Sequence, residues 1–211
     1  MLLKPNDHIL FYGDSITDCG RNRTAVPDAD DGLGNGYVRL AHARLQADFP
    51  RLNLRTTNRG ISGDRVYDLE SRLQQDVLDL KPTVVSILIG INDTWRRYDS
   101  AKLISSPEEF GASYRRILEK LAKELAAKVV ILEPFLLPVP EDRREWREDL
   151  DPRIHVVRDL AVEFGAHYLP LDGLFAQASA RRSAPFWLPD GVHPSAAGHG
   201  LIADAWVRLV S

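Results

Sequence analysis

Short apolar runs and longer amphipathic segments alternate along the whole chain, and this alternation restricts the fold more than any other feature. Five runs are bounded by Gly, Pro, Asp or Asn and have the apolar or alternating character of strands. They cover residues 8–13, 52–58, 83–90, 128–134 and 166–172. Residues 83–90 are almost continuously apolar, which is typical of a strand buried on both faces of a helix-covered parallel sheet.

Segments with apolar residues three or four positions apart lie between and after these runs, and this spacing places the apolar residues on one helix face. The predicted helices cover residues 37–47, 66–80, 107–127, 153–164 and 196–210. The third of these helices has a clear start signal, because Ser106 can cap it and Pro107 suits its first turn. The chain therefore consists of consecutive strand–helix units.

Consecutive strand–helix units predict a doubly wound α/β fold. For five strands we expect a flavodoxin-like three-layer sandwich, with a parallel sheet of order 2-1-3-4-5 and helices on both faces. A length of 211 residues suits one domain that spans residues 1–211. Ligands bind such sheets beyond the carboxyl ends of the strands, where the strand order reverses. Chemistry is therefore expected directly after the first three strands.

Charge and cysteine content exclude several classes of protein. The formal net charge is −3, so no basic excess is present to neutralise phosphates, and we expect no nucleic-acid partner. The single cysteine, Cys19, excludes an intrachain disulfide and a multi-cysteine metal cluster, and we interpret it as a small packed residue.

The sequence contains no long apolar stretch. The longest covers residues 83–91, well short of the roughly 20 residues that a membrane-spanning helix needs. Polar residues between Lys4 and His8 interrupt the first apolar residues, so the pattern of a signal peptide is absent. We expect a cytoplasmic protein that is not bound to a membrane, and the sequence leaves export as a folded passenger and a homo-oligomer open.

Residues with complementary chemistry follow the predicted strands. Ser15 comes after the first strand, Gly63 after the second and Asn92 after the third, and Asp190 and His193 precede the last helix. Acyl transfer needs a nucleophile, a base, a carboxylate that orients the base, and donors for the oxyanion. We expect Ser15, His193 and Asp190 to fill the first three roles. The backbone N–H groups of Ser15 and Gly63 and the Asn92 amide are the predicted donors, and no cofactor or metal is required.

Four short motifs resemble those of a known family. Gly-Asp-Ser-Ile around Ser15, Ser-Gly-Asp around Gly63, Gly-Ile-Asn-Asp around Asn92 and Asp-Gly-Val-His around His193 are similar, in order and spacing, to the blocks of SGNH hydrolases, the GDSL esterase family. Ile16 replaces the leucine of the family name, which is a conservative change. Within the family, GDSITDCGR, GISG, IGIND-x-WR-x-YD and VHPSAAGH resemble intracellular bacterial acetylxylan esterases. This resemblance implies a serine carboxylic ester hydrolase that removes acetyl groups from carbohydrates such as xylooligosaccharides.

Aromatic and basic residues near these motifs are candidates for binding a small ester substrate. Trp95, Arg96 and Tyr98 follow Asn92 closely, and Trp187 lies three positions before Asp190. Aromatic faces with polar edges suit a sugar ring, and a guanidinium can donate to hydroxyl groups. Packing beside the site is the competing interpretation of the aromatic residues.

Other functions remain open on sequence alone. Within the esterases, the alternatives are a lysophospholipase or a thioesterase. A metal-dependent phosphoesterase would have to use Asp190, His193 and His199, although we interpret His199 as structural. A non-catalytic flavodoxin-like binding module, such as a phospho-receiver, could use Asp93 but lacks a lysine after the fifth strand.

Several residues also have purely structural interpretations. Asp14 and Asp93 are expected to stabilise their own turns rather than to catalyse. Ser15 could equally cap a helix, and the other site residues could be turn residues or a structural pair. The segments 21–35 and 138–151 are interpreted as surface loops that could border the site.

Overall fold

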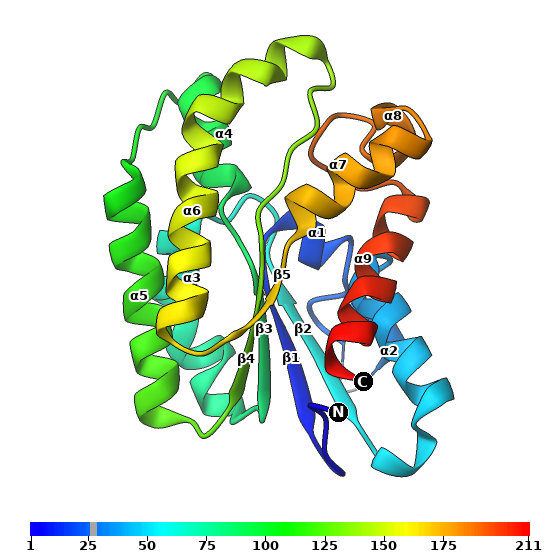
Figure 1. The fold of residues 1–211 in the computed structure, drawn as a ribbon. Helices are drawn as coiled ribbons and strands as arrows, with labels where there is room; N and C mark the ends of the chain where they lie inside the picture. The colour runs from blue at the N-terminus through cyan, green and yellow to red at the C-terminus, as the bar shows by residue number, and fades with distance from the viewer. Residues whose placement is uncertain (26–28) are drawn as a thin grey trace.

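The computed structural model describes residues 1–25 and 29–211 of the chain. All five strands are parallel and lie in one sheet of order β2-β1-β3-β4-β5, as the sequence predicts. The strands are β1 (His8–Gly13), β2 (Arg55–Gly60), β3 (Val84–Leu88), β4 (Lys128–Leu132) and β5 (His167–Leu169). The sheet is the central layer of a three-layer α/β sandwich (Figure 1).

Two layers of helices cover this sheet. On one face lie α3 (Val66–Asp76), α5 (Pro107–Glu124) and α6 (Arg147–Glu163), and on the other lie α2 (Tyr37–Asp48) and α9 (Ala196–Val210) (Figure 1). Side chains of β1 alternate between the two cores: Phe11 packs on Trp206 of α9, and Tyr12 donates a hydrogen bond to Leu69 of α3. Helices on both faces explain why β1 is buried throughout.

Four of the five strands differ from their predicted ranges at one or both ends, and two of these differences have a clear local cause. The second strand begins at Arg55, because Leu52 belongs to the short helix η2 (Pro50–Leu52) and Asn53 turns the chain with a φ of 49°. The fifth strand ends at Leu169, because Leu171 already begins the helix α7 (Leu171–Arg181). The first predicted strand, residues 8–13, is correct at both ends.

Several short elements were not predicted from the sequence pattern. They are α1 (Ser15–Asp18), η1 (Asp30–Leu33), η2, α4 (Ile91–Tyr98), η4 (Glu141–Trp146), α7 and α8 (Ala184–Trp187). The helix predicted over residues 66–80 is divided into α3 and η3 (Leu78–Leu80). Figure 1 shows α1, α4, α7 and α8 at the end of the sheet where the strands finish. The edge that was expected to carry the chemistry is therefore built largely from these short elements.

The two predicted surface loops have different outcomes. Segment 138–151 is not a loop, because it forms η4 and the beginning of α6, which starts at Arg147 and continues through Pro152. Segment 21–35 contains η1, and residues 26–28 of this segment lie outside the described residues.

The start of α5 is confirmed in detail. Glu109 N donates to Ser106 Oγ at 3.2 Å, and Ser106 N donates to Glu109 Oε2 at 2.8 Å, which together form a capping box. Pro107 occupies the first turn.

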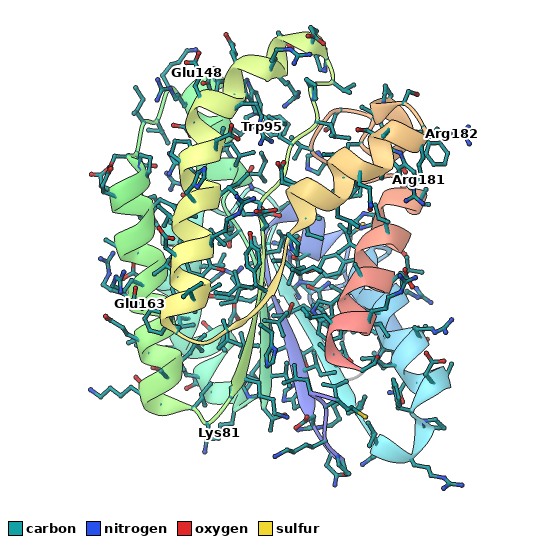
Figure 2. All side chains as sticks on the ribbon, viewed as in Figure 1. Lys81, Trp95, Glu148, Glu163, Arg181 and Arg182 are labelled. Carbon is teal, nitrogen blue, oxygen red and sulfur yellow. The ribbon has the colours of Figure 1, made fainter. Side chains whose placement is uncertain are left out.

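The N- and C-termini lie close together at the amino end of the sheet, opposite the end where the strands finish. Leu2 N donates a hydrogen bond to Val210 O at 2.9 Å, and Figure 1 shows both termini beside the amino ends of the strands. Side chains fill the space between the sheet and both helical layers (Figure 2). No helix in the described part of the chain is long and apolar enough to cross a membrane.

Candidate active site

Three side chains from distant parts of the chain form a continuous line of hydrogen bonds. Ser15 Oγ lies 2.9 Å from His193 Nε2, and His193 Nδ1 lies 2.7 Å from Asp190 Oδ2. Ser15 is the first residue of α1, two positions after the end of the inner strand β1, while the other two lie on the turn before α9. The structure therefore brings together the predicted nucleophile, base and carboxylate.

The turn that carries His193 is fixed by its own carboxylate and by a neighbouring segment. Asp190 Oδ1 accepts from His193 N at 2.7 Å and from Val192 N at 3.0 Å, so both carboxylate oxygens have partners. Gly191 has a φ of 83°, and a Cβ there would lie 2.4 Å from the carbonyl oxygens of Leu137 and Val139. Only glycine therefore fits between the turn and the segment after β4.

The hydrogen bond between Asp190 and His193 shifts both groups toward their charged forms. Burial alone would raise the pKa of Asp190, but hydrogen bonds from His193 and from the Val192 N–H hold that pKa far below its ordinary value. The same hydrogen bond raises the pKa of His193, while burial and the cation of Arg143 oppose the rise. With Nδ1 bonded to a carboxylate, neutral His193 presents Nε2 as an acceptor to Ser15.

The predicted oxyanion donors lie on the segments that follow β1, β2 and β3. Ser15 is the first residue of a helix, so its N–H has no partner within that helix. Gly63 has a φ of 90° and no side chain to block its backbone. Asn92 is buried in α4, and its Nδ2 donates to Asp64 O at 3.0 Å. An amide nitrogen carries two hydrogens, so this bond orients Asn92 and leaves the second donor for a ligand.

The two aspartates beside the site differ in role. Asp14 is fully buried and caps α1 by accepting from Ile16 N at 3.0 Å, which confirms that it stabilises its own turn. Burial raises the pKa of Asp14 to about 7. Asp93 also has a structural role, but its carboxylate reaches beyond its own turn: it accepts from Val66 N at 3.2 Å and so joins α4 to the start of α3.

The segment that carries Gly63 is held by Asp18, which the sequence interpretation missed. Asp18 Oδ2 accepts from Ser62 N at 3.1 Å and from Ser62 Oγ at 3.3 Å, and it pairs with Arg23 at 2.6 Å. Its position three residues after Ser15, in the same short helix, is the signal that could have identified it.

His199, which is buried, and Cys19, which is half-buried, contact each other. His199 Nδ1 accepts from Tyr37 N at 3.1 Å, and its Nε2 lies 3.4 Å from Cys19 Sγ. Burial lowers the pKa of His199 to about 4, so the ring is neutral near pH 7. These contacts agree with a structural role for both residues. Among residues 1–25 and 29–211, no group of three or more His, Cys, Asp or Glu side chains is arranged to hold a metal ion.

Two of the four predicted substrate-binding residues lie beside the site. The ring of Trp95 is 5.9 Å from that of His193, centroid to centroid. Figure 2 shows Trp95 near the end of the molecule where the strands finish. Arg96 Nη2 lies 3.5 Å from Gly63 O, and Arg96 Nη1 pairs with Asp99 at 2.8 Å. Trp95 thus borders the base, and Arg96 borders a predicted oxyanion donor.

The other two predicted substrate-binding residues, Tyr98 and Trp187, use their polar atoms in hydrogen bonds to backbone carbonyls. Tyr98 donates its hydroxyl to Glu145 O at 3.0 Å and stacks on Trp146. Trp187 donates its indole N–H to Arg182 O at 3.0 Å. Both contacts favour packing, the competing interpretation of these aromatic residues.

Two residues of η4 extend the aromatic wall that begins at Trp95. The Trp146 ring lies 5.2 Å from the Trp95 ring, and the Arg143 guanidinium carbon lies within 4.5 Å of both ring centroids. The sequence interpretation missed both residues. Trp146 is the one uncharged residue between positions 141 and 149, and this isolated aromatic was the available signal.

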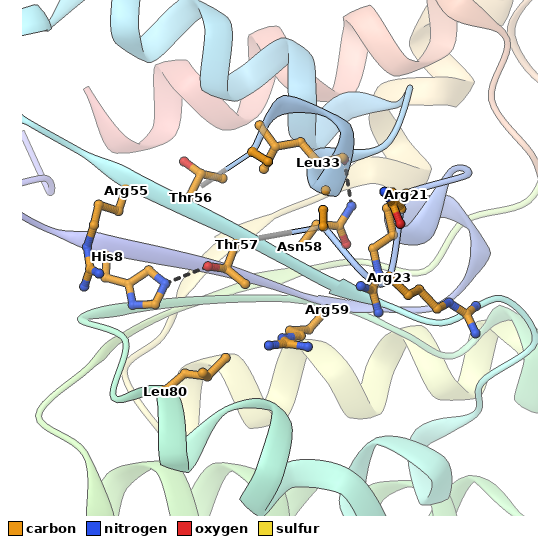
Figure 3. A pocket seen from close by; sticks show the side chains of 14 residues that line it. His8, Arg21, Arg23, Leu33, Arg55, Thr56, Thr57, Asn58, Arg59 and Leu80 are labelled. Atoms are coloured by element: carbon orange, nitrogen blue, oxygen red, sulfur yellow. Dashed lines mark hydrogen bonds between the residues drawn. The ribbon is translucent and has the colours of Figure 1, made fainter. Parts of the chain in front are cut away.

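A separate cavity of about 230 Å³ lies along the edge strand β2 (Figure 3). Four arginines line it, namely Arg21, Arg23, Arg55 and Arg59. His8 Nε2 and Thr57 Oγ1, 2.8 Å apart, form part of its wall (Figure 3). Neither Ser15 nor His193 belongs to this lining, so the cavity is distinct from the line of hydrogen bonds.

Known proteins resemble the chain over its whole length. A curated protein from Geobacillus stearothermophilus, described as an acetylxylan esterase, is 36% identical over 215 positions that cover 100% of this chain and 96% of that protein. Among solved structures, a protein from Parabacteroides merdae described as a GDSL-like lipase superposes with a TM-score of 0.94 and 34% identity, covering 99% of this chain and 97% of the other.

The Geobacillus stearothermophilus acetylxylan esterase is also a structural neighbour. Its crystal structure superposes with a TM-score of 0.89 and 34% identity, covering 100% of this chain and 97% of the other. Further structures of that enzyme are described as catalytic mutants in which a serine, a histidine or an aspartate is replaced by alanine. Residues 11–201 of the present chain match the family model, and the chain therefore belongs to the GDSL-like lipase/acylhydrolase family.

Proposed function

We propose that the chain is a serine esterase that removes acetyl groups from small carbohydrate esters, with acetylated xylooligosaccharides as the substrate class. The observation that supports esterase activity is the line of hydrogen bonds from Ser15 through His193 to Asp190. A serine hydroxyl becomes a nucleophile when an oriented imidazole can take its proton, and the carboxylate keeps the imidazole in the correct tautomer.

In the proposed acylation step, Ser15 Oγ attacks the acetyl carbonyl carbon while His193 Nε2 accepts the hydroxyl proton. The backbone N–H groups of Ser15 and Gly63 and the amide of Asn92 donate to the negative carbonyl oxygen. When the tetrahedral intermediate collapses, the bond between the carbonyl carbon and the sugar oxygen breaks. His193 gives its proton to that oxygen, so the sugar leaves as an alcohol.

Deacylation repeats these steps with water. His193 takes a proton from the water molecule as the water oxygen attacks the acetyl-serine, and the same donors stabilise the second oxyanion. Collapse breaks the bond to Ser15 Oγ, which takes the proton back from His193. The products are acetate and the free enzyme.

Two observations support a sugar acetate as the substrate. The first is the similarity over the whole chain to a protein described as an acetylxylan esterase. The second is the position of Trp95: the leaving alcohol must lie beside His193 to receive its proton, and the indole ring is 5.9 Å from that imidazole. An aromatic face next to the leaving group suits a pyranose ring.

The test is a comparison of kcat/KM across acetyl, butyryl and octanoyl esters of one alcohol, followed by acetylated xylose and xylooligosaccharides. We expect acetyl esters to be the best substrates and the sugar acetates to be converted to free hydroxyl groups. A preference for octanoyl esters or lysophospholipids would replace this proposal with the lysophospholipase or thioesterase alternative, without changing the serine mechanism.

The metal-dependent alternative is tested separately by prolonged treatment with EDTA. Activity should survive, because Ser15 and the oxyanion donors perform the work that a metal would otherwise do. Loss of activity that Zn²⁺ or Mn²⁺ restores would instead support a metal site. A single domain, a cytoplasmic location and a homo-oligomer stay predictions from the sequence.

A further inference from the structure

Arg143 lies on η4 with its guanidinium in the angle between two indole rings. Its Cζ is 4.5 Å from the ring centroid of Trp95 and 4.3 Å from that of Trp146. The two rings are inclined at 63° to one another. A guanidinium at these distances is attracted by the faces of both rings. The aromatic pair therefore fixes where the cation lies.

Two donor atoms of this guanidinium are not used by the described part of the protein. Arg143 Nε and Nη1 are buried and have no hydrogen-bond partner among the residues that the structure describes. The neighbouring Arg144 differs, because it is exposed and pairs with Glu141 at 2.7 Å. Leaving charged donors buried and unpaired costs stability, and native proteins rarely do so without a reason. A ligand that supplies oxygen atoms would satisfy Arg143.

The side chain of Arg143 also lies against the turn that carries the base. A Cβ added to Gly191 would be 3.2 Å from Arg143 Cδ, and Trp95, which contacts the guanidinium, borders the His193 ring. In the proposed reaction His193 protonates the leaving alcohol, so the sugar must occupy the space beside this ring. Arg143 is thus next to the leaving group rather than to the acetyl group.

We propose that Arg143 is a substrate-binding residue whose guanidinium donates hydrogen bonds to neighbouring hydroxyl oxygens of the sugar that leaves. This inference rests on the proposed function, and it identifies the specificity as one for polyhydroxylated leaving groups. The planar guanidinium carries donors along more than one edge, so it can bind more than one sugar oxygen, and the rings of Trp95 and Trp146 hold it in place. The cation needs no proton transfer for this role.

The experiment compares Arg143→Met with Arg144→Met on two acetyl esters. One ester is an acetylated xylooligosaccharide, and the other is a nitrophenyl acetate, whose leaving group has no hydroxyl pair. In Arg143→Met, we expect the ratio of the two kcat/KM values, sugar over aryl, to fall about 10- to 100-fold, as expected for a lost hydrogen bond to a charged donor. Arg144→Met should keep the wild-type ratio.

Arg143→Lys provides a second measurement, because it keeps a positive charge and a long stem but lacks the planar guanidinium. Its ratio should also fall, by less than in the methionine variant. Equal losses on both esters in both Arg143 variants would overturn the inference, since they would mean that Arg143 supports the turn or His193. An unchanged ratio in both variants would overturn it as well. If the wild-type enzyme hydrolyses the aryl acetate but not the sugar acetate, the proposed substrate fails before Arg143 is tested.

Discussion

At the scale of single residues, the site depends on hydrogen bonds that constrain each polar group from more than one direction. Asp190 receives three hydrogen bonds from the turn it begins, and Asn92 is oriented by the carbonyl of Asp64. The sequence predicted these residues because each has a fixed place relative to a strand or helix. The sequence interpretation missed Arg143 and Asp18, whose roles depend on contacts with segments far away in the chain, although the position of Asp18 close to Ser15 was an available signal.

Ser15→Ala should lower kcat for a short aryl acetate by roughly 10⁶, because it removes the nucleophile. His193→Ala should be similarly severe. Since the two residues act as one unit, the double variant should lose little more than either single variant. Steady-state kinetics with circular dichroism spectra of all three variants test this expectation. Additive losses, or a tenth of wild-type turnover in Ser15→Ala, would contradict the assigned roles.

Asn92→Ala should lower kcat by roughly 10²–10³ with a smaller change in KM, because one oxyanion donor is lost. Asn92→Asp is the matched variant, since it keeps the shape but replaces donors by acceptors and should be at least as severe. Both require a check of the melting temperature, as the bond to Asp64 is lost too. A raised KM with an unchanged kcat would show that Asn92 acts in ground-state binding instead.

At the scale of elements, the spacing of apolar residues predicts the helices and strands that bury a whole face. It misses the short helices that are stabilised by individual contacts. β3 was recognisable because its residues are all buried and apolar or small. α4 was missed because Asn92, Asp93 and Thr94 are poor helix formers. The sequence also does not show that the Asp93 carboxylate accepts a hydrogen bond from α3 and so joins the two helices.

The start of α6 was misplaced for a similar reason. Pro152 normally marks the beginning of a helix, and the dense charges before it resemble a surface loop. In the folded chain, Arg147 pairs with Asp172 at 2.7 Å, and Arg153, fully buried, pairs with Asp149 at 3.0 Å. One tertiary ion pair, from Arg147 to Asp172, and one pair within α6, from Arg153 to Asp149, thus stabilise the helix on both sides of Pro152.

Ser106→Ala should lower the free energy of unfolding by about 1 kcal/mol, because the first turn of α5 loses its side-chain cap. Ser106→Gly should lower the free energy of unfolding by only a few tenths of a kcal/mol, since glycine is a tolerated N-cap. Urea unfolding at fixed pH measures both, and esterase activity should not change because α5 lies away from Ser15. Equal losses in the two variants would point to a role for Ser106 beyond capping.

At the scale of the whole molecule, stability must depend on pH through carboxyl groups buried without a counter-charge. Asp14 has a pKa raised by burial from 3.8 to about 7, and one of its oxygens has no partner among the described residues. Between these two pH values the folded state holds a proton that the unfolded state has lost. This group therefore makes the fold less stable as pH rises from about 4 to about 7.

Asp14→Asn keeps the oxygen that caps α1 but cannot ionise. The stability of this variant relative to wild type should increase by a few kcal/mol between pH 4 and pH 8, at about 1.4 kcal/mol per pH unit within the window. Urea unfolding of both proteins across this range provides the difference, in which groups that do not interact with Asp14 cancel. His193 does not cancel fully, because the negative charge of Asp14 contributes to the raised pKa of His193. A difference that stays constant with pH would mean that Asp14 titrates normally.

The separation between Ser15 and His193 has a consequence for the protein while it is being made. The two residues that share a hydrogen bond are 178 positions apart. Ribosomes extend a chain by about 5–20 residues per second, so roughly 10–40 s separate the synthesis of the first residue from that of the second. A nascent chain thus carries its hydroxyl without its imidazole for most of translation. Ester hydrolysis can begin only after the segment before α9 has left the ribosome and closed onto the carboxyl end of β1.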